Sequence, residues 1–132
     1  MLALLPRKVI TDPCAAPEVG PLMVRYRLLR TPWFNVYLHH FLRSDFDRAC
    51  HDHPWDFTTF LIGGGYWENT PMGRFWRRQF SVLHRCAEWQ HWVEVVKPVW
   101  TLILVRPKRR EWGFITPRGW VQWRDFERSG CE

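Results

Sequence analysis

The sequence predicts an all-β domain, built as a sandwich or a barrel, for three reasons. Helical periodicity is nearly absent, and short β-branched and aromatic runs alternate with Pro, Gly, Asn and Asp turn signals. The chain has 132 residues, enough for one domain and too few for two. Its 10 Trp, 9 Phe and 3 Tyr can fill a substantial core, so the composition excludes an intrinsically disordered chain.

The predicted elements divide the chain into three parts. Residues 1–21 carry prolines at positions 6, 13, 17 and 21, and we expect them to form an extended N-terminal arm. A barrel is expected over residues 22–116, with strands at 24–30, 35–42, 50–53, 56–62, 66–69, 74–80, 81–84, 91–96, 100–105 and 111–116. In the tail, residues 117–132, Trp120, Trp123 and Phe126 recur at i, i+3 and i+6, which predicts a short helix packed on the barrel.

The charge pattern allows an anionic partner. The net charge is +6, and all basic residues except Lys8, Lys97 and Lys108 are arginines, which suit phosphate and carboxylate recognition. The basic residues are dispersed along the chain, however, so a solvated basic surface is favoured over a nucleic-acid interface. Because no nucleic-acid-binding motif is present, nucleic acid ranks behind a small anionic ligand as the expected partner.

Several features favour a cytoplasmic protein. No apolar run approaches the roughly 20 residues of a membrane-spanning helix, so no membrane association is expected. The apolar start at residues 1–5 is cut short by Pro6 and precedes the basic residues, whereas a secretory signal has the opposite order. The cysteines form no C-x-x-C pair, which favours reduced thiols in the cytosol.

The run His51-Asp52-His53 is the strongest chemical signal. Two residues at i and i+2 of a strand point to the same face, which places two imidazoles side by side. Imidazole is the commonest neutral metal ligand, so the pair predicts a metal site, with His91 as the best candidate for a third ligand. The competing explanation is a chance pair on a half-exposed strand.

These histidines carry a resemblance to the cupin superfamily. The first cupin motif reads G(x)5HxH(x)3–4E(x)6G, and His51, His53 and Gly65 match its paired histidines and its closing glycine. Thr58 stands where the motif has its glutamate ligand, and Asp45 stands where it has its opening glycine. The chain therefore resembles the motif in its histidines and departs from it in its carboxylate.

The second cupin motif, G(x)5PxG(x)2H(x)3N, keeps only its histidine here, as His91. The runs at 51–55 (HDHPW), 65–68 (GYWE) and 112–114 (WGF) are similar to those of small, uncharacterised cupin-like proteins of bacteria and phages. The resemblance covers roughly residues 34–116. It implies an all-β, single-domain, double-stranded β-helix, a jelly-roll barrel of the kind that often pairs as a homodimer.

The resemblance also implies a metal ion in the bowl of the barrel, held by His51, His53 and His91. Without the glutamate, the site resembles the all-histidine sites of thiol dioxygenase-type cupins, where an anionic substrate balances the charge. We therefore expect a non-haem metal-dependent oxygenase acting on a small anionic substrate, with Fe(II) favoured over Zn, Ni or Mn. Asp56 or His84 could supply a further ligand, and a degenerate cupin without metal is the competing hypothesis.

Further residues are expected around the site. Glu68 and Tyr66 follow the closing glycine on a strand that should line the bowl, where they could act as catalytic acid or base groups. Arg43, Arg48 and His40 are expected at the rim, where they could contact the substrate. A structural salt-bridge cluster explains the two arginines equally well.

Two other functions compete with the oxygenase. The first is a non-catalytic barrel that binds a small ligand or nucleic acid, and salt-sensitive nucleic-acid binding would support it. The second is an isomerase or epimerase, whose metal-independent form needs an acid/base pair from His39, His40 or Tyr66. Strand alternation turns one of His39 and His40 inward, and the sequence leaves open which one.

Overall fold

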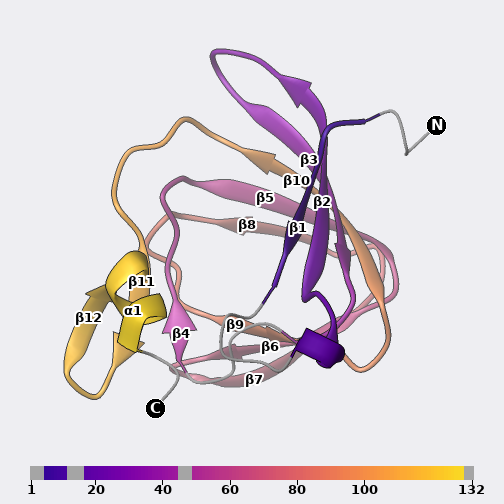
Figure 1. The fold of residues 1–132 in the computed structure, drawn as a ribbon. Coiled ribbons are helices and arrows are strands. Elements are labelled where there is room, and N and C mark those ends of the chain that lie inside the picture. The colour runs from indigo at the N-terminus through magenta and orange to yellow at the C-terminus, as the bar shows by residue number, and fades with distance from the viewer. Residues whose placement is uncertain (1–4, 12–16, 45–48, 130–132) are drawn as a thin grey trace.

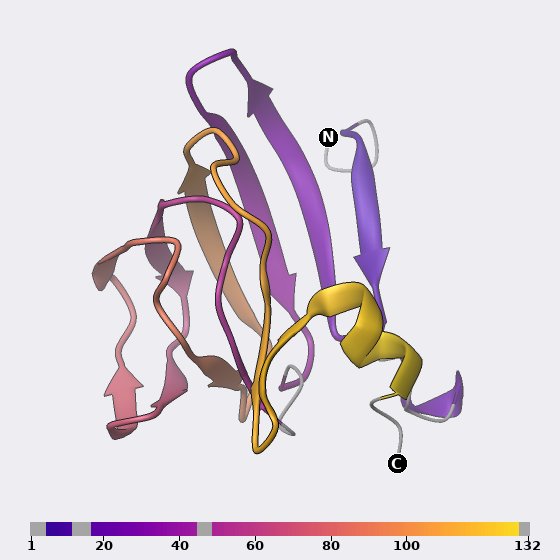
Figure 2. The same ribbon diagram turned by 90° about the vertical axis from the view of Figure 1, so that its left-hand side faces the viewer.

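The computed structural model describes residues 5–11, 17–44 and 49–129, and they form an all-β fold with a short C-terminal helix (Figure 1). Figure 2 shows the strands in two layers that face each other, with the helix packed beside them. The predicted all-β jelly-roll class is confirmed by this architecture. Among these residues, no helix is long and apolar enough to cross a membrane.

The first sheet has six antiparallel strands in the order β1-β2-β3-β10-β5-β8. Their bounds are β1 Arg7–Ile10, β2 Met23–Arg30, β3 Asn35–Phe41, β10 Val99–Val105, β5 Phe57–Gly63 and β8 Val82–Arg85. In β10 every second residue is buried, from Val99 to Val105, and the residues between them are half-buried. This period of two identifies the inner face of the sheet across all its strands.

The second layer consists of two three-stranded sheets, β12-β11-β4 and β7-β6-β9. Their bounds are β4 Cys50–His51, β6 Tyr66–Thr70, β7 Gly73–Arg77, β9 Trp92–Glu94, β11 Gly113–Thr116 and β12 Gly119–Gln122. An antiparallel bridge between His51 and His91 joins the two sheets at β4 and β9. The two histidines therefore lie at the centre of this layer.

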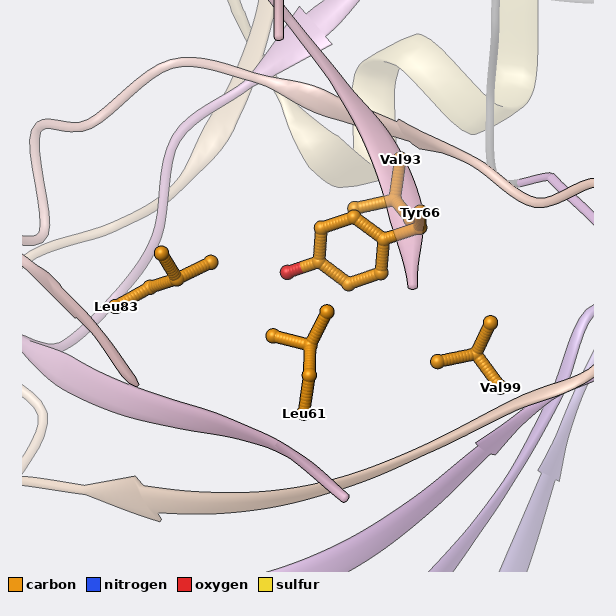
Figure 3. Packing of buried hydrophobic residues seen from close by; sticks show 5 residues of the cluster. All are labelled: Leu61, Tyr66, Leu83, Val93 and Val99. Atoms are coloured by element: carbon orange, nitrogen blue, oxygen red, sulfur yellow. The ribbon is translucent and has the colours of Figure 1, made fainter. Parts of the chain in front are cut away.

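The apolar core lies between the layers. Leu61, Leu83 and Val99 come from the first sheet, and Tyr66 and Val93 come from the second. Figure 3 shows these side chains pointing toward one another across the gap. Burial of such side chains supplies about 1.5–3 kcal/mol each, which holds the two layers together.

Several elements differ from the sequence prediction. The strands predicted over residues 50–53, 74–80 and 111–116 are the shorter β4, β7 and β11. The N-terminal arm contains a strand, β1, which pairs with β2. The strand predicted over residues 91–96 is limited to Trp92–Glu94. The predicted helical stripe in the tail is wrong at Trp120, which lies in β12 opposite Ile115, so α1 begins only at Trp123 and runs to Ser129.

Candidate metal centre

Three imidazoles converge at one point between the layers. His51 ends β4, His53 follows two residues later, and His91 immediately precedes β9. One nitrogen of each ring lies within 4.8 Å of the corresponding nitrogens of the other two, and among the described residues these three form the group that could hold a metal ion. The ring centroids are 5.1, 4.9 and 4.9 Å apart, so the rings form a nearly equilateral triangle.

Backbone hydrogen bonds fix this convergence. The His51 N–H donates to the His91 carbonyl at 2.9 Å, and the His91 N–H donates back to the His51 carbonyl at 3.0 Å. Directly opposed residues of an antiparallel pair project to the same face, so both rings point inward. His53 lies beyond the end of β4, where its N–H donates to the Ala87 carbonyl at 2.8 Å.

The hydrogen bonds of two rings leave one nitrogen available for a metal. His91 Nδ1 donates to Glu68 Oε2 at 2.6 Å, and His53 Nδ1 donates to the Trp89 carbonyl at 3.1 Å. Since a carboxylate and a carbonyl only accept, both Nδ1 atoms carry protons, and the Nε2 atom of each ring in its neutral form keeps its lone pair. His51 Nδ1 is buried and has no hydrogen-bond partner among the described residues. Buried polar atoms are usually paired, so this nitrogen is suited to coordinate a metal ion.

The electrostatic environment keeps His51 and His53 neutral. Burial lowers the pKa of His51 well below its ordinary value, and repulsion from His91 lowers it further. Burial likewise lowers the pKa of His53, with repulsion from His51 and His91 adding to the effect. Neutral imidazole is the form that binds metal, so these two rings are in the form that a metal site needs.

Glu68 lies behind His91, on the side away from its free nitrogen. Its buried carboxylate also accepts from Arg77 at 2.9 Å, from Arg85 at 2.8 Å and from the Trp89 indole N–H at 2.9 Å. Burial would raise the pKa of Glu68, but the hydrogen bonds from His91 and Arg85 outweigh it and hold the pKa well below its usual range. Glu68 is thus an ionised carboxylate that orients a histidine.

Aromatic rings enclose the three histidines. Phe57 lies 4.3 Å from the His53 ring centre, and Trp112 and Phe114 each lie 6.0 Å from the His51 ring centre. These rings surround the imidazoles with apolar surface, which strengthens electrostatic interactions inside the site.

Asp52, between the paired histidines, faces away from them and connects their segment by hydrogen bonds to the hairpin of β11 and β12. Its buried carboxylate accepts from the Gly113 backbone N–H at 2.8 Å, from Arg110 at 2.8 Å and from the Trp120 indole N–H at 2.9 Å. A side chain at Gly113 would collide with the Val121 backbone, so only glycine allows this close approach.

The two residues proposed as further ligands lie elsewhere. Asp56 is nearly half exposed and pairs with Arg109 at 2.8 Å. His84 is exposed and bonds Thr58 Oγ1 through Nδ1 at 2.9 Å, on the outer face of the first sheet. Because Phe57 faces the histidines, strand alternation turns Thr58 outward. The position of the motif's glutamate therefore does not face this centre.

The residues expected at the rim are also distributed differently. His40 faces outward and stacks on Trp100, with ring centres 3.8 Å apart, so it departs from the expected rim position. His39 is the buried, inward-facing member of that pair. Arg43 is half-buried next to the N-terminal part of the first sheet, and Arg48 lies outside the described residues.

Tyr66, expected as a catalytic group, lies in the apolar core between Leu61 and Val93 (Figure 3). Two residues that sequence reasoning missed, Arg25 on β2 and Tyr37 on β3, face the interior beside His39, which the epimerase alternative names. The alternating run Val24-Arg25-Tyr26 would ordinarily turn its arginine to solvent, so the sequence carried no signal for this placement.

Comparison with known proteins places the fold. No family model matches this chain, and no curated protein matches it. The polyketide cyclase RemF from Streptomyces resistomycificus has a similar structure, with a TM-score of 0.69 and 12% identity over 88% of this chain and 83% of that one. FeII HppE gives a TM-score of 0.61 and 13% identity over 80% of this chain, which spans 58% of the HppE chain. A cupin domain from Bordetella pertussis Tohama I has a TM-score of 0.51 and 13% identity, over 64% of this chain and 93% of that one.

Proposed function

We propose that this chain, a barrel with the cupin fold, is a metal-dependent enzyme of the non-haem oxygenase type that acts on a small anionic substrate. The observation that carries the proposal is the convergence of His51, His53 and His91 at one point, with His51 and His53 held neutral mainly by burial. One protein of similar structure, HppE, is described in its FeII form, and we propose Fe(II) here as well.

The donor set fits a divalent ion. Three ligand nitrogens about 2.0–2.1 Å from one ion lie about 3.0–3.6 Å from one another. The three nitrogens, which now lie within 4.8 Å of one another, would therefore approach one another by up to about 1–2 Å on binding the ion. Imidazole suits Fe, Zn, Cu and Ni, and three protein ligands leave positions open for substrate. When bound, the ion would activate oxygen or polarise a carbonyl as a Lewis acid.

The protein's own groups would prepare the site in three ways. Glu68 and the Trp89 carbonyl orient two of the imidazoles and increase their basicity. The rings of Phe57, Trp112 and Phe114 limit the access of water. The three ligands carry no charge, so a bound divalent ion keeps its full charge and favours an anionic substrate.

Elemental analysis tests the metal site. Untagged protein purified without chelators is expected to contain close to one equivalent of metal, and His53→Ala to contain none. His40→Ala is the matched control, because it removes a histidine that stacks on Trp100 outside the cluster. An electron paramagnetic signal of an iron–nitrosyl complex after adding Fe(II) and nitric oxide tests the oxygenase type. Wild-type protein without metal would instead support the binding module or the metal-independent epimerase.

A further inference from the structure

Arg25 is turned into the barrel. On β2, Arg25 lies opposite His39 of β3. His39 lies opposite Thr101 of β10, and Thr101 lies opposite Leu61 of β5. His39, Thr101 and Leu61 are all buried, and opposed residues of neighbouring strands share a face. Arg25 therefore belongs to a row that crosses the inner face of the first sheet, and the exposed Lys8 of the edge strand β1 lies opposite it on its other side.

Among the described residues, this arginine has no anionic partner. In the part of the chain that the structure describes, no Asp or Glu forms an ion pair with Arg25. Its Nε donates to His39 Nε2 at 3.0 Å, and its guanidinium lies 4.9 Å from the centre of the Tyr37 ring. Burial lowers the pKa of Arg25 despite the opposing effect of Tyr37. Arg25 is half-buried, and a cation withdrawn from water without an anionic partner among the described residues is costly, so such a group marks a place for an anion.

A second unsatisfied group lies in the same row. Thr101 Oγ1 is fully buried and has no hydrogen-bond partner among the described residues. Buried hydroxyl groups are nearly always paired in proteins, so an unpaired one beside His39 needs an explanation. Both groups are explained if the interior next to them accepts a polar ligand.

The row shares its interior with the three histidines. Tyr37, beneath the guanidinium of Arg25, packs on the cluster that contains Phe57. Phe57 in turn lies 4.3 Å from the His53 ring centre and 6.3 Å from that of His91. Two aromatic rings thus separate the guanidinium from the candidate metal centre, a separation that a small molecule with an apolar body can span.

The chemistry favours a carboxylate. His39 occupies the Nε of Arg25, which leaves the two terminal amino groups as a planar fork that matches the two oxygens of a carboxylate. Because His39 Nε2 accepts this bond, the ring is neutral and carries its proton on Nδ1. It therefore has no positive charge with which to attract the anion away from Arg25. The lowered pKa of His39, caused by burial and by Arg25, is consistent with the neutral ring.

We propose that Arg25 binds the carboxylate of the substrate, that His39 positions its guanidinium, and that the substrate is a small carboxylic acid with an apolar body lying against Tyr37 and Phe57. This inference rests on the proposed function, since it names the substrate class of the same site. It also predicts a binding preference that is measurable without turnover.

Benzoate and its neutral isostere benzamide are suitable probes, measured by calorimetric titration of wild-type protein with and without Fe(II) under anaerobic conditions. Wild-type protein is expected to prefer benzoate, and Arg25→Met to weaken benzoate binding about ten- to a hundredfold, as for lost hydrogen bonds to a charged group. Arg30→Met is the matched control, because it removes an exposed arginine at the end of the same strand and is expected to leave benzoate binding unchanged.

Arg25→Met is expected to unfold at the wild-type temperature or above it, because it removes a half-buried charge that has no anionic partner among the described residues. Arg25→Lys keeps the charge without the planar fork and is expected to bind benzoate about tenfold more weakly than wild type. Equal affinity of wild type and both variants for benzoate, or no preference of wild type for benzoate over benzamide, would overturn the proposal. Failure of wild type and Arg25→Met alike to bind Fe(II) would instead refute the metal function, and the metal-free titrations would still decide the role of Arg25.

Discussion

His51 and His91 exchange both backbone hydrogen bonds, at 2.9 and 3.0 Å, although one ends β4 and the other precedes β9. This single bridge joins the two small sheets of the second layer and brings two metal-ligand candidates to the same face. Folding of the layer and assembly of the site are therefore one event. A change that disturbs the bridge is expected to weaken both metal binding and stability.

Replacement of Glu68 separates orientation from acid/base chemistry. Glu68→Gln is expected to lower metal affinity about ten- to a hundredfold, because His91 loses its carboxylate partner. It is also expected to cost about 3 kcal/mol in the free energy of unfolding, since Arg77 and Arg85 lose their partner. Metal titration and urea unfolding measure the two effects.

Glu94→Gln is the matched control for Glu68, because its ion pair with Arg74 lies at the surface. We expect it to change the unfolding free energy by less than about 1 kcal/mol and to leave metal affinity unchanged. If Glu68→Gln lost turnover while keeping full metal affinity, Glu68 would be an acid/base catalyst rather than a group that orients His91.

The carboxylate of Asp52 is expected to contribute strongly to stability. Asp52→Asn removes the charge that holds Arg110, Trp120 and the Gly113 N–H, and we expect a loss of about 3 kcal/mol. Asp56→Asn is the control, because Asp56 is nearly half exposed, and it is expected to cost about 1 kcal/mol or less. Equal losses in urea unfolding for the two variants would show that the connection through Asp52 is not stabilising.

The metal-free protein is expected to lose stability as the pH falls below about 6.5, the pKa of an unfolded histidine. His39 is held neutral in the fold, since burial and Arg25 lower its pKa, so the unfolded chain binds a proton that the folded chain does not. The stabilisation is present above the unfolded pKa and is lost as the pH falls through it.

Urea unfolding in the presence of a chelator, at pH 7.5 and 5.5, measures this dependence. His39→Gln keeps an acceptor for the Arg25 Nε but cannot be protonated, so we expect a smaller loss than in wild type, by up to about 1.4 kcal/mol per pH unit. An identical loss in the two proteins would assign the pH dependence to other groups.

Local patterns predicted much of this fold. The apolar run at residues 100–105 identified β10, and the histidine spacing identified His51 and His53, because both signals depend on neighbours in the chain. The tail was different. Trp120 matches a helical stripe, but its indole N–H bonds Asp52 and its backbone pairs with Ile115, so tertiary contacts decided its conformation.

The rest of the site could not be predicted because it depends on which face a residue occupies. Thr58 stands at the motif's glutamate position, but the inward Phe57 turns it outward beside His84. Arg25 faces inward because it lies directly opposite the buried His39, and opposed residues share a face of the sheet. Which residues of a strand face inward is fixed by its pairing across the sheet, and a single sequence does not contain that information.

X-ray absorption spectroscopy at the iron edge tests the central claim most directly, because it counts the ligands of the bound ion. For wild-type protein loaded with Fe(II), we predict scattering from three imidazoles and no protein carboxylate, and for His91→Ala we predict two imidazoles. A first shell with fewer than three imidazoles in wild type, or with a carboxylate from the protein, would contradict the account.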